Sequence, residues 1–280
     1  MAIRIITDST SDIDLADQKA LGIDIVSLNV IFDDKKFTDG VDLKKDQFYE
    51  MLSKAEHLPT TSQVNPDGFE DLFKGYIDAG DEIIGIFISS KLSGTYQSAV
   101  IVQQALASNN IYVVDSKSAT FGLALLVYEA IKQRDSGVPA KEIFDSLMSL
   151  RDRIEFYAVV DTLKYLKMGG RLSSSAAFLG GMLNIKPLVS LIDGEVKSPG
   201  KARGQSAAFA AIAEKIKENA PDKNYPIVSG HTNDPKLMDD FNAYIEKSAG
   251  VKPDHICEIG CVIGTHSGPG CVGLAYVKAV

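Results

Sequence analysis

Apolar positions along the first half of the chain fall into short runs of strand length, separated by stretches with helical periodicity. The short runs predict strands over residues 3–7, 26–32, 82–88 and 111–114, with a hairpin turn over residues 33–36. Apolar residues three and four apart predict helices over residues 94–107, residues 119–134 and around Phe48, Met51 and Leu52. This alternation predicts a largely parallel sheet flanked by helices on both faces.

The second half repeats the alternation with a hairpin inside it. It predicts strands over residues 156–160, 186–192, 195–197, 227–229, 256–263 and 271–277, and helices over residues 207–219 and 235–248. Asp193-Gly194 is a strong hairpin signal, and Asp234 is a suitable N-cap for the last helix. We therefore predict an α/β fold of two α/β lobes, residues 1–155 and 156–280, the second with a mixed sheet.

Composition narrows the classes of function. The chain has 280 residues, is 45% hydrophobic and has a net charge of −8. The apolar fraction suffices for packed cores, whereas the negative charge argues against a general binder of nucleic acid or anionic membranes. We expect no stable membrane insertion, because every apolar stretch is shorter than the roughly 20 residues of a membrane span. The polar residues Thr7 and Asp8 come too early for a signal peptide, which favours a cytoplasmic protein.

Loops rich in Ser and Thr are the main candidates for chemistry, because ligands of α/β sheets bind in the loops that follow strands. Such loops cover residues 8–12, 59–63, 89–95, 115–118 and 264–268. Helix capping is one interpretation of each loop. Ser93 precedes Gly94 at a predicted helix N-terminus, where a carboxylate or phosphate could also bind. Thr61 and Ser62 would add neutral hydroxyl donors to such a site.

Motifs for common cofactors are missing from the sequence. It contains no G-x-G-x-x-G, no phosphate-binding G-x-x-x-x-G-K-[ST], no G-x-S-x-G and no H-E-x-x-H, so no cofactor is predicted. His255, Cys257, Cys261, His266 and Cys271 could be read as metal ligands. On a strand, however, Cys257 and Cys261 would lie about 13 Å apart, so we expect buried thiols and no metal.

Three further features could serve binding. His266 falls in a predicted tight turn between apolar strands, which could carry its ring into a cleft. Lys164, Lys167 and Arg171 recur at helical spacing, as expected for a solvated face or for a patch that docks an acidic partner or a phosphate. The segment 176–185 is apolar with small residues, so it could pack in a core or leave room for a long apolar ligand.

Five segments together resemble the DegV family of bacterial fatty-acid-binding proteins, in the same order along the chain. They are residues 8–12 (DSTSD), 59–63 (PTTSQ), 89–96 (SSKLSGTY), 163–171 (LKYLKMGGR) and 264–270 (GTHSGPG). Val64 departs from the family, where a proline more usually follows Ser-Gln. The resemblance implies a fatty acid enclosed between two α/β lobes. It also implies a partner, because family members with an assigned role are acyl-binding subunits of an ATP-dependent fatty acid kinase.

The resemblance implies roles for individual residues as well. Thr61 and Ser93 would hold the fatty-acid carboxylate with Ser62 close by, His266 would belong to the same polar network, and Arg171 would dock the kinase. Physical chemistry agrees with this reading. Each buried methylene of the tail contributes about 0.8 kcal/mol, and hydroxyl donors can satisfy the carboxylate without an ion pair.

Two other functions remain open at the level of sequence. One is a serine-dependent esterase or acyltransferase with Ser93 as nucleophile and His266 as base, although neither an elbow turn nor an orienting carboxylate is evident. The other is a regulatory or sugar-phosphate-binding module that uses the Ser/Thr loops as anion sites. The leading hypothesis is a lipid carrier without catalysis of its own.

Overall fold

A computed structural model describes residues 2–173 and 184–280 of the chain. Its first sheet is parallel throughout, with the strand order β2-β1-β6-β7. These strands are β1 (Ile3–Asp8), β2 (Ile23–Val26), β6 (Glu82–Phe87) and β7 (Ile111–Asp115). Ile5, Ile84 and Phe87 are fully buried on opposite faces of this sheet, so its strands read as continuous apolar runs. The predicted parallel sheet is confirmed.

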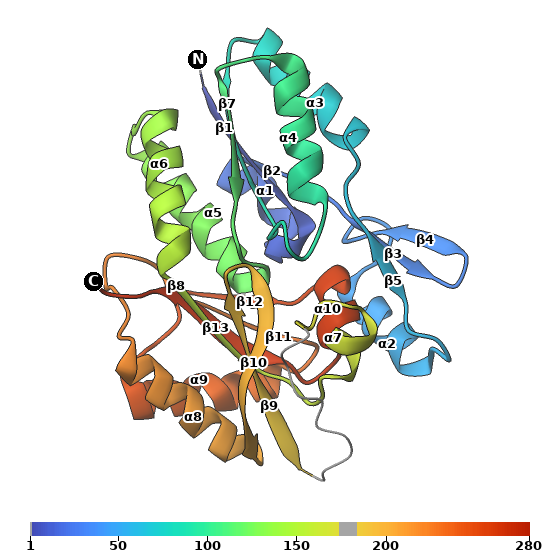
Figure 1. Cartoon of the computed structure of the whole chain (residues 1–280), viewed down its shortest axis with the longest axis vertical. Helices are drawn as coiled ribbons and strands as arrows, with labels where there is room; N and C mark the ends of the chain where they lie inside the picture. The colour runs from blue at the N-terminus through green and yellow to red at the C-terminus, as the bar shows by residue number, and fades with distance from the viewer. Residues whose placement is uncertain (1, 174–183) are drawn as a thin grey trace.

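Helices cover both faces of the first sheet, as Figure 1 shows. They are α3 (Asp67–Asp78) and α4 (Thr95–Leu106) on one face, and α5 (Thr120–Asp135) and α6 (Ala140–Leu150) on the other. The short helix α1 (Gln18–Leu21) leads into β2. The helices α3 and α6 are additional to those predicted from apolar spacing.

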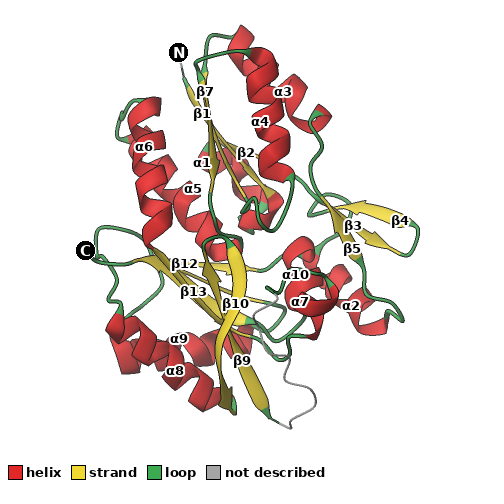
Figure 2. Cartoon of the chain, in the orientation of Figure 1, coloured by secondary structure: helices red, strands yellow, loops and turns green. Residues whose placement is uncertain are grey.

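The second sheet is mixed, with the strand order β10-β9-β8-β13-β11-β12 (labelled in Figure 1), and its strands are drawn in yellow in Figure 2. Its strands are β8 (Ile154–Val159), β9 (Ile185–Ile192), β10 (Glu195–Arg203), β11 (Val228–His231), β12 (His255–Glu258) and β13 (Val272–Val277). Neighbours pair antiparallel except β11 and β12, which are parallel. Helices α8 (Gln205–Glu218) and α9 (Pro235–Ala249) pack together on one face. The hairpin at Asp193-Gly194 and the N-cap at Asp234 are both confirmed.

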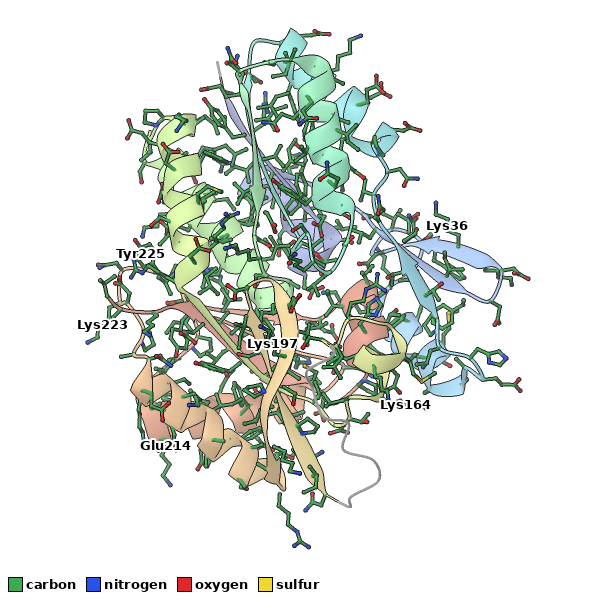
Figure 3. The ribbon with its side chains drawn as sticks, in the orientation of Figure 1. Lys36, Lys164, Lys197, Glu214, Lys223 and Tyr225 are labelled. Carbon is green, nitrogen blue, oxygen red and sulfur yellow. The ribbon has the colours of Figure 1, made fainter. Side chains whose placement is uncertain are left out.

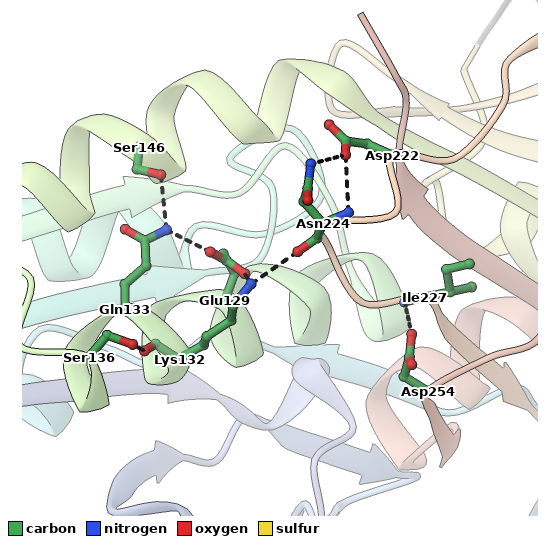
Figure 4. A network of polar contacts seen from close by, with 9 residues as sticks. All are labelled: Glu129, Lys132, Gln133, Ser136, Ser146, Asp222, Asn224, Ile227 and Asp254. Carbon is green, nitrogen blue, oxygen red and sulfur yellow. Dashed lines mark hydrogen bonds and ion pairs between the residues drawn. The ribbon is translucent and has the colours of Figure 1, made fainter.

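Helix α5 packs against both sheets. It contacts β1 and β6 of the first sheet and β8, β11 and β13 of the second. A polar network on its outer side, drawn in Figure 4, holds it in place. Gln133 Nε2 donates to Glu129 Oε1 at 2.9 Å and to Ser146 Oγ of α6 at 3.0 Å, and Lys132 Nζ donates to the Asn224 carbonyl at 3.0 Å. The buried apolar side chains of α5 belong to one hydrophobic core that includes residues of both sheets.

The predicted strand over residues 26–32 is wrong as a single element. β2 ends at Val26, and β3 (Asn29–Phe32) joins a separate antiparallel sheet with β4 (Lys35–Thr38) and β5 (Thr60–Ser62), in the order β4-β3-β5. The apolar residues Val26, Leu28, Val30 and Phe32 alternate without interruption across this break, so a period of two gives no sign that the chain changes sheets. The turn before Phe37 is confirmed, and α2 (Lys45–Lys54) buries Phe48 and Leu52 beside this small sheet.

The predicted strand over residues 256–263 is also wrong in its second half. β12 ends at Glu258, and α10 (Cys261–Ser267) follows. Apolar runs this short suit a strand or a buried helical turn equally well. Helix α7 (Lys164–Met168) ends before Arg171, so Arg171 does not continue its helical face as the spacing predicted.

Some predictions lie beyond what the structure tests. Residues 176–183 of the small-residue apolar segment fall outside the described residues. The division of the chain into lobes 1–155 and 156–280 stays a prediction. Within the described ranges, no helix has the length and apolar character needed to cross a membrane.

Candidate functional site

A cavity of about 290 Å³ lies where the loops after β6 and β7 meet the second sheet and α10. Most of its wall is apolar and comes from both halves of the chain, as with Ile88, Phe121, Phe156, Val160 and Val189. The β9–β10 hairpin is held against the loop after β6, because Ser89 Oγ donates to the Gly194 carbonyl at 2.7 Å. The cavity lies beyond the carboxyl ends of parallel strands, where ligands of α/β sheets bind.

All five residues expected to serve binding line this one cavity: Thr61, Ser62, Ser93, Arg171 and His266. They come from β5, from the turn before α4, from the segment after α7 and from α10. All five are partly exposed, whereas the apolar wall contains side chains that are almost completely buried. The cavity therefore has a polar end near the surface and an apolar end in the interior.

Thr61 and His266 form the best-defined contact at the polar end. Thr61 Oγ1 lies 2.9 Å from His266 Nε2, across 205 residues of sequence. His266 is on α10 and not in the tight turn that the sequence predicted. Burial, together with the smaller effect of the nearby positive charge of Arg171, lowers the pKa of His266 to about 4. The imidazole is therefore neutral at neutral pH.

The surroundings of the His266 ring indicate which of its two nitrogens carries the single proton. His266 Nδ1 is buried and has no hydrogen-bond partner among the described residues. It lies against Gly169, where an added Cβ would be 2.2 Å from Nδ1. A buried N–H without an acceptor is rare in proteins, so we assign the proton to Nε2, which donates to Thr61 Oγ1. The hydroxyl hydrogen of Thr61 is then available to a ligand oxygen.

Ser93 lies at the start of α4, as predicted. Its Oγ accepts a hydrogen bond from the Thr95 N–H at 3.3 Å and lies 3.0 Å from Thr95 Oγ1. This serine precedes the N-cap Gly94, accepts the N–H of the first helical residue and also borders the cavity, so a local role at the helix start and a binding role are compatible. Ser62 follows Thr61 on β5, but its Oγ lies 3.4 Å from Asn29 Nδ2, which donates to it.

Arg171 is folded along the cavity wall. Its Nη1 donates to the Gly169 carbonyl at 2.6 Å and its Nε to the Leu92 carbonyl at 3.2 Å. The polar end thus contains a permanent cation, in addition to the neutral donors that the sequence suggested. Two hydroxyls beside a neutral imidazole suit one carboxylate, while the guanidinium is engaged by the Gly169 and Leu92 carbonyls.

The esterase hypothesis requires a different arrangement. A catalytic serine needs a histidine within hydrogen-bond reach and a third group that orients that histidine. Here His266 Nε2 contacts Thr61, Ser93 Oγ contacts Thr95, and Nδ1 of the histidine has no partner among the described residues. The described residues therefore do not form a Ser-His-acid triad around Ser93.

Two carboxylates that sequence reasoning did not assign to the site hold the start of α10. Asp12 Oδ1 accepts the Gly260 N–H at 2.8 Å, and Asp39 Oδ1 accepts the Cys261 N–H at 3.2 Å. Burial raises the pKa of both, that of Asp12 to about 7. They position the helix that carries His266. The two acids of the loop over residues 8–12 were the available signal, but the sequence offered helix capping or ligand binding for this loop and not a contact with a distant helix.

Local capping does account for other parts of the Ser/Thr loops. Asp8 Oδ1 accepts the Thr10 N–H at 2.9 Å as a local cap, while its Oδ2 accepts the N–H of the distant Ile88, after β6, at 2.8 Å. Asp115 Oδ1 accepts the Lys117 N–H at 3.1 Å. These two loops therefore shape the carboxyl ends of the first sheet without lending their carboxylates to the cavity.

The remaining histidines and the cysteines have ordinary surroundings. His57 is exposed, His231 Nδ1 accepts the Asp234 N–H at 3.2 Å, and His255 stacks on Tyr128 with ring centroids 4.0 Å apart. The cysteines Cys257, Cys261 and Cys271 are buried and free. Within residues 2–173 and 184–280, no group of three His, Cys, Asp or Glu side chains is arranged to hold a metal ion.

Comparison with known proteins shows similarity along the whole chain. A family model described as "Uncharacterised protein, DegV family" matches residues 2–279. A DegV domain-containing protein of Caldanaerobacter subterraneus subsp. tengcongensis is 36% identical over 275 residues, covering 98% of both chains. The structure of a fatty-acid-binding DegV family protein from Thermus thermophilus matches with a TM-score of 0.89 and 28% identity, covering 100% of both chains. A stearic acid-binding protein from Eubacterium ventriosum matches with a TM-score of 0.90 and 27% identity, covering 99% of this chain and 98% of that one.

Proposed function

The chain belongs to the DegV family, and from this premise we propose that it binds a long-chain fatty acid in its central cavity and presents the carboxylate to an ATP-dependent fatty acid kinase. The observation that carries the proposal is one cavity with an apolar interior that ends in the hydroxyls of Thr61 and Ser93 beside His266. Structures of similar chains from Thermus thermophilus and Eubacterium ventriosum are described as fatty-acid-binding, which supports the choice of ligand.

The apolar and polar ends of the cavity contribute to binding in different ways. The tail supplies most of the affinity, because each methylene removed from water contributes about 0.8 kcal/mol. The head needs orientation, which the Thr61 and Ser93 hydroxyls provide as donors, while Ser62 shapes the adjoining strand. His266 fixes the Thr61 hydroxyl by donating to its oxygen, so that the hydroxyl hydrogen points to the ligand. A carboxylate held in this way keeps one oxygen for an incoming phosphoryl group.

The surface around the polar end supports presentation to a partner. The five residues of the polar end are partly exposed, so the carboxylate would sit close to solvent. Beside them α7 presents Lys164, which lies on the surface in Figure 3, and Met168, which is 63% exposed. A basic and apolar surface on a chain of net charge −8 suits an acidic patch on the kinase. Arg171, next to this surface, is the residue proposed to contact the kinase, and catalysis is proposed to occur on the kinase.

A pair of matched variants on β5 tests the proposal. Thr61→Val removes the hydroxyl from the polar end, whereas Thr60→Val makes the same change at an exposed position on the same strand. Titration with palmitate should give about 10- to 150-fold weaker binding for Thr61→Val, since a hydrogen bond to a charged group is worth about 1.5–3 kcal/mol. Thr60→Val should bind as the wild-type chain does. Equal affinities for the two variants, or no palmitate binding by the wild-type chain, would contradict the proposal.

A further inference from the structure

The second sheet is open between β8 and β9. Their ladder consists of Ala158 opposite Val189 and Val159 opposite Leu188, although both strands continue toward the β9–β10 turn. Beyond this short ladder, Ser190 Oγ donates to the Phe156 carbonyl at 2.6 Å across the gap. A second cavity of about 590 Å³ occupies the region where the two strands diverge.

The second cavity adjoins the acyl cavity through a common wall. Phe156, Ala158, Val189 and Leu191 line both spaces. Successive residues of a strand point to opposite faces, and Tyr157 accordingly belongs to the core beneath α8 while Phe156 and Ala158 belong to the core on the other face. The second cavity also reaches residues of α8. The gap between the strands is therefore a passage through the sheet toward α8, and this common wall separates the passage from the acyl cavity.

The chemistry of the passage suits a hydrocarbon in its middle and water at its rims. Leu188, Leu191 and Ile212 of α8 line the interior. At one rim Lys117 and Asp152 form an ion pair at 2.6 Å, and at the α8 rim lies the exposed Lys215. Cations and anions are both present at the rims, so no single charge is selected there. Arg151, Glu155 and Asn219 also line this cavity, so an apolar chain that arrives from the acyl cavity fits the part of the wall formed by Leu188, Leu191 and Ile212.

We propose that this passage is a second acyl subsite, which receives the methyl end of fatty acids that are longer than the main cavity holds. The inference rests on the proposed fatty-acid binding and adds a preference for long chains to it. Phe156 stands at the junction, with its ring stacked on Phe121 at a centroid distance of 4.3 Å and an interplanar angle of 10°. A rotation of this ring away from Phe121 joins the two cavities, and buried methylenes of the ligand replace the lost stacking contact.

Two serines of the β9–β10 hairpin provide a matched test. Ser190 donates to the Phe156 carbonyl in the gap, and Ser198 donates to the Leu188 carbonyl at 2.8 Å without lining either cavity. Ser190→Leu fills the passage, whereas Ser198→Leu makes the same change and loses the same kind of hydrogen bond outside it. Affinities would be measured by calorimetry for myristic, palmitic, stearic, arachidic and behenic acids. Each methylene that stays buried should strengthen binding about fourfold.

The expected result is a difference in chain-length dependence. In the wild-type chain and in Ser198→Leu, affinity continues to rise to the longer acids, whereas in Ser190→Leu it stops rising at a shorter acid with myristate binding unchanged. The same break point in all three proteins, or an equal loss for every acid in Ser190→Leu, would overturn the subsite. If Ser190→Leu does not fold, Leu188→Phe obstructs the same passage and replaces it. Failure of every acid to bind the wild-type chain would instead refute the proposed function.

Discussion

Gly169→Ala should displace the His266 ring without altering any polar group. Gly169 has φ −73° and ψ −5°, which alanine adopts without strain. Its added Cβ, however, would lie 2.2 Å from His266 Nδ1 and 2.9 Å from Cε1, with the Tyr165 carbonyl 3.1 Å away on the backbone side. The backbone leaves little room for the methyl group to retreat, so the ring moves and its 2.9 Å contact with Thr61 is lost.

The size of the effect follows from these contacts. Overpacking of this kind costs about 1–3 kcal/mol of unfolding free energy. Loss of the Thr61–His266 hydrogen bond leaves the Thr61 hydroxyl unoriented, at a cost of about 1 kcal/mol, or fivefold in affinity for palmitate. Urea unfolding and calorimetric titration measure the two quantities. NMR titration of His266 adds a third readout, because a displaced ring regains solvent and its pKa rises from about 4 toward 6.5.

Gly75→Ala on α3 is the matched control. Nothing lies within 4 Å of the Cβ that it would add, and Gly75 is exposed in a helix interior. This control should raise stability by about 0.5–1 kcal/mol and leave palmitate binding unchanged. If Gly169→Ala binds palmitate like the wild-type chain and its His266 still titrates near pH 4, the ring is not held against Gly169 as described, and the assignment of its proton fails.

Three more predictions concern the groups around the cavity. Asp39→Ala should lower the unfolding free energy by about 1–2 kcal/mol and weaken palmitate binding, whereas Asp39→Asn, which keeps an acceptor for the Cys261 N–H, should retain binding in the same titration. From pH 6.5 to pH 4 the unfolded chain takes up more of a proton at His266 than the folded chain does, because the pKa of His266 is lower in the folded state. The unfolding free energy of the wild-type chain should therefore fall by about 3 kcal/mol relative to that of His266→Gln in urea unfolding. Comparing the two proteins removes the opposite contribution of Asp12, whose raised pKa favours the folded state as pH falls and which both proteins contain. Arg171→Ala should reduce kinase-dependent acyl-phosphate formation while co-purified lipid, measured by mass spectrometry, stays in place; an empty cavity would contradict the docking role.

Short sequence motifs correctly predicted the elements that depend on residues close together in the sequence. The hairpin at Asp193-Gly194 and the N-cap at Asp234 depend on residues a few positions apart, and both are present. Buried parallel strands are equally readable, because both of their faces are apolar. The helix α10 was predicted as the end of a strand followed by a tight turn, because its start depends on Asp12, which lies 248 residues away from the N–H that it accepts. No window along the sequence contains both partners of that hydrogen bond.

The candidate site likewise contains residues that the sequence could predict and features that it could not. Hydroxyl-rich loops after strands, together with a family resemblance, selected Thr61, Ser93 and His266 before any contact was known, and all three line one cavity. The proton position on His266 was out of reach, because it depends on Gly169 lying against the ring. So was the gap between β8 and β9, since the sequence of each strand gives no sign of where the pairing between their backbones ends.

Mass spectrometry of the intact protein tests the central claim most directly. The chain would be purified without detergent, sprayed under native conditions and then extracted with organic solvent. The account predicts one bound fatty acid per chain, released on denaturation, with much lower occupancy when Thr61→Val and Ser93→Ala are combined. A wild-type chain that carries no fatty acid after several gentle preparations, and that takes none up from added palmitate, would contradict the account.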